Sequence, residues 1–208
     1  MTPIPCRTDF AFYADKYFSK TGNAVEVGAY RGEFAAHNLK QWNGFYLLVD
    51  TWAHREGEPD DKNSKESSEW EEIYNAAGEN IALYYGRAGM LKTTSIEAAD
   101  CFKDGYFDWI FIDAGHDYKN ISKDLNAWWP KLRRGGLFSG DDYGLSADSE
   151  NLLPMTAQRW EDKYSGVAKT YDWGTALALE EFCQKNDKSL NITWMNDRYK
   201  TPAWYIIK

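Results

Sequence analysis

The chain has 208 residues, a formal net charge of −8 and a pI of about 5.0. This length predicts one domain with a substantial core, and the acidic balance argues against an extended nucleic-acid surface. The three cysteines form no CxxC pair and no apolar run is long enough to span a membrane, so we expect neither a disulfide framework nor a membrane partner, and a reducing, cytoplasmic compartment.

The first half of the chain alternates helical patterns with short apolar runs. The predicted elements are, in order, a helix over 7–20, a strand over 24–27, a helix of about ten residues before Asn43-Gly44, a strand over 45–50, a helix over 67–78, a strand over 80–86 and a helix over 94–102. Residues 54–70 are highly charged and poor in apolar side chains. We interpret them as a surface insertion.

The second half continues the alternation of strands and helices, which becomes less regular after residue 143. The predicted elements are a strand over 107–112, a helix from residue 119 that Gly135-Gly136 ends, a strand over 136–143, helices over 155–164 and 174–186, and strands over 190–196 and 203–208. Too few residues join the last two strands for a crossover helix, so this pair should be antiparallel. The sequence therefore predicts a single α/β domain over residues 1–208 with a mainly parallel sheet.

Acidic residues gather where the predicted strands end. Glu26 lies at the end of the first strand, Asp50 closes the second, Asp113 closes the fourth, and Asp141 and Asp142 close the fifth. Open α/β sheets bind ligands at this edge. A single aspartate here could merely cap a helix, but five acids at one edge of the sheet favour a binding site.

The turn after the first strand indicates which ligand this edge binds. Gly28 and Gly32 flank Ala29, Tyr30 and Arg31, so the central glycine of a dinucleotide-binding GxGxxG turn is absent. S-adenosylmethionine carries no phosphate, and its sulfonium, ammonium and ribose diol suit anions and acceptors. Asp50 is placed to accept hydrogen bonds from both ribose hydroxyls.

Four segments together carry a family resemblance: "VEVGAYRG", "LLVDTW", "FIDAGHDY" and "GGLFSGDDY". They resemble class I S-adenosylmethionine-dependent methyltransferases, and in particular metal-dependent small-molecule O-methyltransferases of the macrocin and mycinamicin type. The resemblance implies a Rossmann-like fold with a seven-stranded sheet, an antiparallel C-terminal strand and helices on both faces. The implied cofactor-binding residues are Glu26, Gly28, Tyr30, Gly32, Asp50, Thr51, Trp52, Ser95 and Asp113.

The resemblance also implies a divalent cation, Mg²⁺ or Mn²⁺, held by Asp113, Asp141 and Asp142. All-oxygen anionic ligands suit these hard cations rather than zinc. His116 occupies the position at which related enzymes keep a lysine base, so we expect it to be the general base, with Asp113 as the rival. His116 could instead be a structural histidine bonded to a loop carbonyl, and Ser95 could simply cap its helix.

The predicted activity is therefore methyl transfer from S-adenosylmethionine to a small-molecule hydroxyl, most simply that of a sugar or glycan. A catechol-type phenol is the alternative acceptor. A nucleotide-binding oxidoreductase and a non-enzymatic Rossmann-like module are the other two hypotheses. Residues 144–174, with Tyr143, are expected to contact the acceptor, and the oligomeric state stays open.

Overall fold

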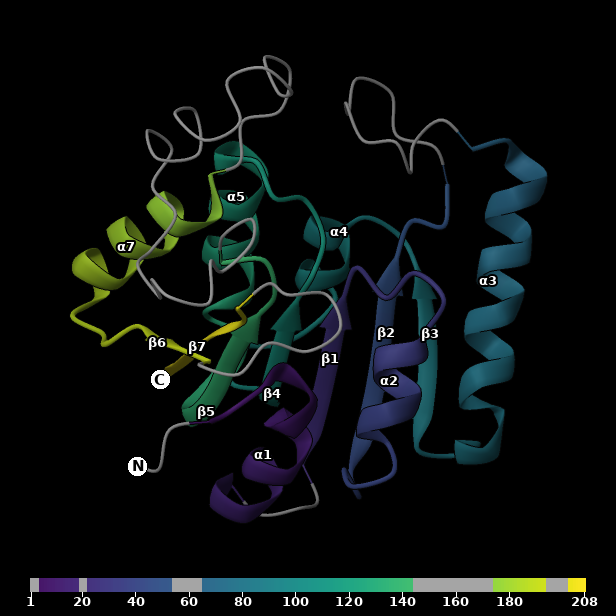
Figure 1. Cartoon of the computed structure of the whole chain (residues 1–208), viewed down its shortest axis with the longest axis horizontal. Helices are drawn as coiled ribbons and strands as arrows, with labels where there is room; N and C mark the ends of the chain where they lie inside the picture. The colour runs from purple at the N-terminus through teal and green to yellow at the C-terminus, as the bar shows by residue number, and fades with distance from the viewer. Residues whose placement is uncertain (1–3, 19–21, 54–64, 144–173, 194–201) are drawn as a thin grey trace.

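The computed structural model describes residues 4–18, 22–53, 65–143, 174–193 and 202–208. Its centre is a seven-stranded sheet with the order β3-β2-β1-β4-β5-β7-β6 (Figure 1). The strands are β1 (Asn23–Val27), β2 (Phe45–Asp50), β3 (Ala88–Lys92), β4 (Phe107–Ile112), β5 (Leu132–Gly140), β6 (Asn191–Ile192) and β7 (Trp204–Ile207). The pairs among β1 to β5 are parallel, whereas β7 pairs antiparallel with both β5 and β6. The predicted sheet, with its antiparallel C-terminal strand, is confirmed.

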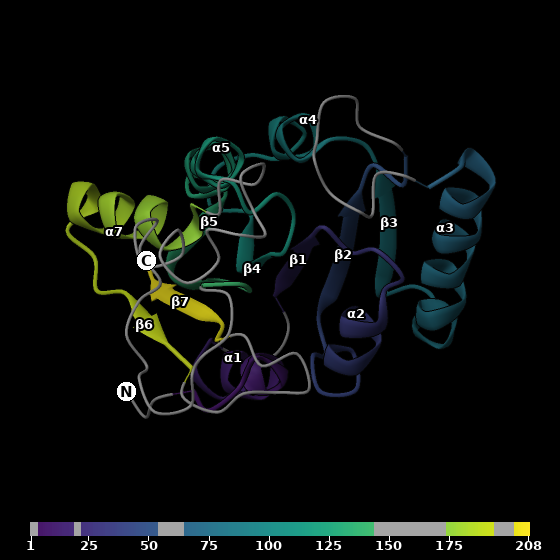
Figure 2. The same ribbon diagram turned by 45° about the horizontal axis from the view of Figure 1, so that its top comes forward.

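Helices cover both faces of the sheet. Helices α1 (Phe10–Phe18), α2 (Glu33–Asn38) and α3 (Ser67–Ile81) contribute to one apolar cluster, whereas α4 (Ser95–Asp100), α5 (Tyr118–Trp128) and α7 (Thr175–Asn186) contribute to the other. The 3₁₀ turn η1 (Arg7–Asp9) precedes α1. Figure 2 shows the second group above the sheet and α1 and α2 below it. None of the helices in the described ranges has the length and apolar character needed to cross a membrane.

Strand β4 lies in the middle of the sheet and is buried on both faces. Ile110 and Ile112 pack with α4, α5 and α7, while Trp109 and Phe111 pack with α1, α2 and α3. Successive side chains of a strand point to opposite faces, so four bulky apolar residues in a row fit a strand with helices on each side. The chain leaves this core at Asp113, whose backbone N–H donates to the neighbouring strand β1.

The predicted third strand over 80–86 is wrong. Ile81 instead completes the buried side of α3, and a 3₁₀ turn (Ala82–Tyr84) follows it. Leu83 and Tyr85 are 92% and 98% exposed, so the apolar and aromatic residues of this segment do not mark a buried strand. The true strand β3 begins at Ala88, and none of its residues is fully buried, because it lies at the edge of the sheet.

The helix predicted to end at Gly135-Gly136 is also shorter than expected. It ends at Trp128, just before Pro130, whose ring cannot continue a helix. Strand β5 begins at Leu132 and contains both glycines, with a register shift against β4 at this point. Gly135 has a φ of 71°, which marks an irregularity of the strand instead of a helix end.

Candidate functional site

A cavity of about 480 Å³ lies at the carboxyl ends of the parallel strands. This is the edge at which open α/β sheets bind ligands. The predicted site residues in its wall are Glu26, Gly28, Tyr30, Asp50, Thr51, Ser95, Asp113, Asp141 and Asp142. Gly32, Trp52 and His116 lie outside the wall, but Trp52 contacts Asp50 and His116 contacts Asp142, which both belong to it.

The turn after β1 depends on glycine for two different reasons. Gly28 has a φ of 91°, and a Cβ there would lie 2.0 Å from the carbonyl oxygen of Asp113. The backbone after β1 can therefore approach the end of β4 only at a residue without a side chain. Gly32 has a φ of 70°, and its Cβ would lie 3.2 Å from the Cα of Ala77. It fits the start of α2 against α3.

The Asp50 carboxylate is held in one orientation at the end of β2. Its Oδ2 accepts the backbone N–H of Tyr30 and its Oδ1 accepts that of Trp52, each at 2.9 Å. Tyr30 and Trp52 have positive φ values of 46° and 41°. This left-handed backbone conformation is strained for bulky residues, and such strain tends to occur at functional sites. The Trp52 indole N–H donates to the Tyr30 carbonyl at 2.7 Å. Trp52 is thus buried beneath the turn, where it supports Asp50.

Ser95 joins the cavity wall to the interior of the helical layer. Its hydroxyl donates to Asp124 Oδ1 at 2.5 Å and accepts the indole N–H of Trp128 at 2.9 Å. The helix cap is Thr94, whose side chain accepts the N–H of Glu97. The interpretation of Ser95 as the N-cap is therefore wrong, and its hydroxyl is fixed by tertiary contacts.

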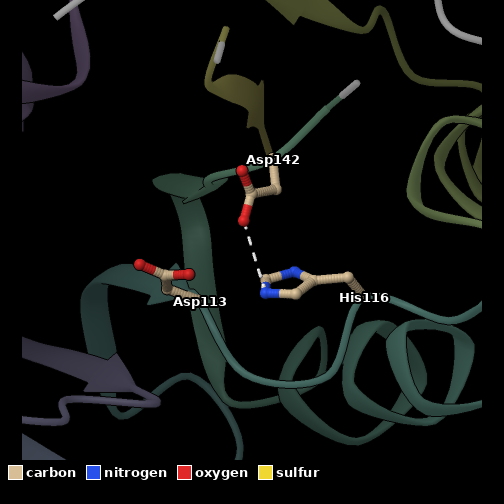
Figure 3. A group of neighbouring side chains, drawn as sticks. All are labelled: Asp113, His116 and Asp142. Atoms are coloured by element: carbon tan, nitrogen blue, oxygen red, sulfur yellow. Dashed lines mark ion pairs between the residues drawn. The ribbon is translucent and has the colours of Figure 1, made fainter. Parts of the chain in front are cut away.

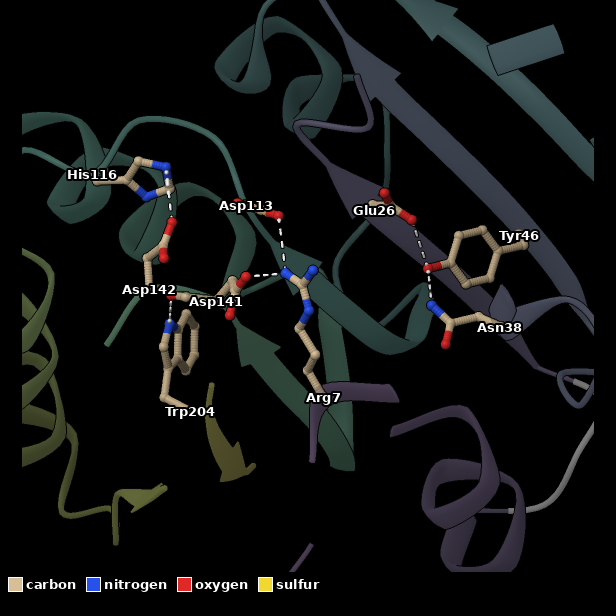
Figure 4. A network of polar contacts seen from close by, with 9 residues as sticks. All are labelled: Arg7, Glu26, Asn38, Tyr46, Asp113, His116, Asp141, Asp142 and Trp204. Carbon is tan, nitrogen blue, oxygen red and sulfur yellow. Dashed lines mark hydrogen bonds and ion pairs between the residues drawn. The ribbon is translucent and has the colours of Figure 1, made fainter. Parts of the chain in front are cut away.

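Glu26 is a buried acid at the inner end of the cavity. Tyr46 donates its hydroxyl to Glu26 Oε2 at 3.0 Å, and Asn38 donates to the same Tyr46 oxygen at 3.0 Å (Figure 4). Burial, and secondarily the Asp113 charge, raise the pKa of Glu26 well above the ordinary glutamate value despite the Tyr46 hydrogen bond. Its buried position at the cavity wall thus favours the protonated form of this side chain.

We expect Glu26→Gln to reduce the pH dependence of stability. Because the pKa of Glu26 is raised in the folded state, the folded protein keeps a proton that the unfolded chain releases as pH rises above 4.5. The free energy of unfolding then falls with rising pH, and glutamine does not share this fall. In thermal unfolding from pH 4.5 upward, the Tm of the variant minus the Tm of wild type should increase with pH. The exposed Glu79→Gln is the control, and a pH-independent difference for Glu26→Gln contradicts the assignment.

Asp113, His116 and Asp142 form a cluster on which a metal ion could bind (Figure 3). One ligand atom from each residue lies within 4.8 Å of the other two. His116 Nε2 is 3.3 Å from Asp142 Oδ2, and the His116 carbonyl accepts the N–H of Gly174 at 3.0 Å and the hydroxyl of Thr175 at 3.2 Å. The start of α7 thus fixes the position of this histidine.

Asp141 and Asp142 diverge just after β5. The strand ends at Gly140 and Asp142 has a φ of 51°, so the break in the strand that two adjacent ligands would require is present. Only Asp142 turns toward His116, however, whereas Asp141 is directed to Arg7 (Figure 4). Among the described residues, the cluster that could hold a metal ion contains His116 where the sequence predicted Asp141.

Arg7 lies in the cavity wall and was not among the predicted site residues. Its guanidinium pairs with Asp141 and lies 3.8 Å from Asp113 Oδ2. Asp141 is 5% exposed, and burial together with the neighbouring aspartates raises its pKa well above the ordinary value, an effect that Arg7 opposes. Asp141 Oδ1 has no hydrogen-bond partner among the described residues. No local motif marks Arg7, which is 134 positions from Asp141.

The region expected to contact an acceptor lies mostly outside the described residues. This applies to the helix over 155–164 and to all of 144–173. Tyr143 is described, and it is buried, with its hydroxyl donating to Glu180 of α7 at 3.3 Å. Burial and the Glu180 charge raise the pKa of this phenol. Tyr143 thus packs against α7 and not in the cavity wall.

One family model matches the chain. A family model described as a methyltransferase domain matches residues 25–143, from β1 to just beyond β5. No curated protein matches the chain.

Solved structures share the fold at low sequence identity. A protein from Corynebacterium glutamicum has a TM-score of 0.63 and 14% identity, over 99% of this chain and 82% of that one. A putative caffeoyl-CoA O-methyltransferase from Staphylococcus aureus has a TM-score of 0.60 and 15% identity, over 99% and 86%. An O-methyltransferase from Bacillus cereus in complex with S-adenosylhomocysteine has a TM-score of 0.58 and 13% identity, over 97% and 80%.

Proposed function

The chain belongs to the methyltransferase domain family, and we propose that it transfers a methyl group from S-adenosylmethionine to a hydroxyl oxygen of a small molecule. The observation that carries this proposal is the set of carboxylates in one cavity wall, Glu26, Asp50 and Asp113. The cofactor brings a ribose diol, an ammonium and a sulfonium, which these groups can accept or neutralise. Similarity of fold to O-methyltransferases supports oxygen as the acceptor atom.

The cofactor lies along the carboxyl edge of the sheet in this proposal. Asp50, with both oxygens oriented by backbone N–H groups, accepts the ribose hydroxyls. Adenine lies toward Thr93 and Ser95, which follow β3 and line the same cavity. The methionine part lies toward Gly28 and Glu26, so the methyl group faces the ends of β4 and β5.

His116 is the proposed general base. The ring nitrogen that does not face Asp142, Nδ1, takes the proton of the acceptor hydroxyl, and the Asp142 carboxylate, 3.3 Å from Nε2, stabilises the imidazolium that forms. The oxygen then forms a bond to the methyl carbon as the bond from carbon to sulfur breaks, and S-adenosylhomocysteine leaves. Much of the acceleration comes from holding the two reactants in line.

The residues present fit a divalent cation beside this base. Asp113 and Asp142 would hold it, and their carboxylate oxygens are the donors that Mg²⁺ and Mn²⁺ prefer. The buried Asp141 Oδ1, which has no partner among the described residues, is a further oxygen donor at the same edge. When bound, such a cation lowers the pKa of a coordinated hydroxyl. A histidine that held the cation through Nε2 would lose its pairing with Asp142, so in this proposal the two carboxylates would hold the cation and His116 stays the base.

A sugar or glycan is the proposed acceptor, and a catechol-type phenol is the alternative. The two are separated by incubating the protein with methyl-labelled S-adenosylmethionine, Mg²⁺ and matched panels of sugars, glycosides and catechols. We expect label in a sugar methyl ether and stoichiometric S-adenosylhomocysteine. Label in catechols alone would replace the sugar proposal. If no acceptor in either panel is labelled, the proposal of a small-molecule O-methyltransferase fails.

A further inference from the structure

Arg7 places a largely buried cation next to acidic residues in the cavity wall. Its side chain is 12% exposed and lines the cavity together with Glu26, Asp113 and Asp141. The other arginine in the wall, Arg31, is exposed and lies over the Tyr30 ring. Of the two arginines that line the cavity among the described residues, Arg7 is therefore the less exposed one and lies beside Asp113 and Asp141.

The segment that carries Arg7 is anchored on both sides of the residue. Before it, the Ile4 N–H donates to the Tyr205 hydroxyl at 3.1 Å. After it, the Thr8 carbonyl lies 2.8 Å from His37 Nε2. The Arg7 guanidinium itself lies over the Phe34 ring, 5.5 Å from its centroid. The cation is thus pre-organised, which lowers the entropy cost of binding an anion.

The position of Arg7 along the sheet indicates which anion it meets. The groups proposed to hold ribose and adenine follow β2 and β3, whereas Arg7 lies beside Asp113 after β4 and Asp141 after β5. The methionine part of the cofactor extends in this direction. That part carries one carboxylate, which the surrounding acids would repel and a guanidinium would bind through two parallel hydrogen bonds.

We propose that Arg7 binds the α-carboxylate of S-adenosylmethionine, an inference that rests on the proposed function. A guanidinium has five N–H donors, so one group can hold Asp141 and the cofactor carboxylate together. A purely structural Arg7 would neutralise Asp141 and nothing more. In that case its removal would change stability without changing the preference for ligands that carry a carboxylate.

Binding of two ligands by calorimetry distinguishes these roles. S-adenosylhomocysteine has the carboxylate, and its decarboxylated analogue S-adenosyl-3-thiopropylamine lacks only that group. Wild type should prefer the first ligand by about ten- to a hundredfold, the usual range for hydrogen bonds between charged groups. In Arg7→Ala this preference should fall to near one, whereas Arg7→Lys should keep part of it and Arg31→Ala most of it.

Loss of Arg7 leaves the buried Asp141 carboxylate without its cationic partner, and a second pair of variants controls for this effect. If Arg7→Ala does not fold, Arg7→Ala/Asp141→Asn is compared with Asp141→Asn, and only the double variant should lose the preference. A full preference in a variant without Arg7 overturns the inference while leaving the proposed function intact. Wild type that binds neither ligand overturns both.

Discussion

The variant His116→Ala is expected to lose about 10²- to 10⁴-fold in turnover, the usual contribution of a positioned general base. Its affinity for S-adenosylhomocysteine should stay unchanged, because the His116 ring lies outside the cavity wall and pairs with Asp142. Single-turnover kinetics with labelled cofactor measure the first quantity, and calorimetry measures the second.

The matched variants separate the base from its neighbours. His116→Gln keeps a polar side chain without a basic nitrogen, so it should lose as much turnover as His116→Ala. Asp113→Asn tests the rival base. Turnover at the wild-type rate in His116→Ala would refute the assignment of His116. Asp113 would then become the base if Asp113→Asn is inactive although it still binds S-adenosylhomocysteine and keeps the Mg²⁺-dependent rise in Tm.

Removal of divalent cations is expected to have an effect of similar size. In EDTA, turnover should fall to background and return with Mg²⁺ or Mn²⁺, because the acceptor hydroxyl then lacks the charge that favours its ionisation. Binding of S-adenosylhomocysteine should persist in EDTA, since Glu26 and Asp50 do not depend on the cation.

Thermal unfolding gives a readout of the cation that does not depend on activity. A cation at about 100 times its dissociation constant stabilises the folded state by about 2.7 kcal/mol, so saturating Mg²⁺ should raise Tm of the wild type. Asp142→Asn should remove most of this shift, whereas Asp104→Asn, a surface acid with a 74% exposed side chain, should keep it. Full turnover in EDTA together with no Mg²⁺-dependent change in Tm would exclude the metal site.

The fold was predictable where the apolar pattern of a segment matches its burial in the structure. The apolar run of β4 is buried on both faces, so its composition and its environment give the same answer. The strand prediction over 80–86 failed because Ile81 completes the buried side of α3, while Leu83 and Tyr85 are exposed in and after the following turn. Single-sequence propensity does not distinguish an exposed tyrosine from a buried one, and the half-exposed β3 lacks the apolar signal of the central strands.

The site was predictable to the extent that strand ends determine it. Asp50 and Asp113 reach the cavity because parallel strands end at the same edge of the sheet. The pairing of Asp141 with Arg7 joins residues 134 positions apart in the sequence. The burial of Trp52 depends on a strained turn that only the three-dimensional structure shows. Side-chain contacts between residues far apart in the sequence leave no local sequence pattern from which they could be predicted.

Titration of the wild-type protein with S-adenosylhomocysteine in EDTA tests the central claim most directly. The cavity at the carboxyl edge of the sheet predicts one site per chain, with a dissociation constant in the micromolar range and a marked loss of affinity in Asp50→Ala. If wild type binds no S-adenosylhomocysteine, or if Asp50→Ala binds it equally well, the carboxylates of this cavity do not form a cofactor site and the account is wrong.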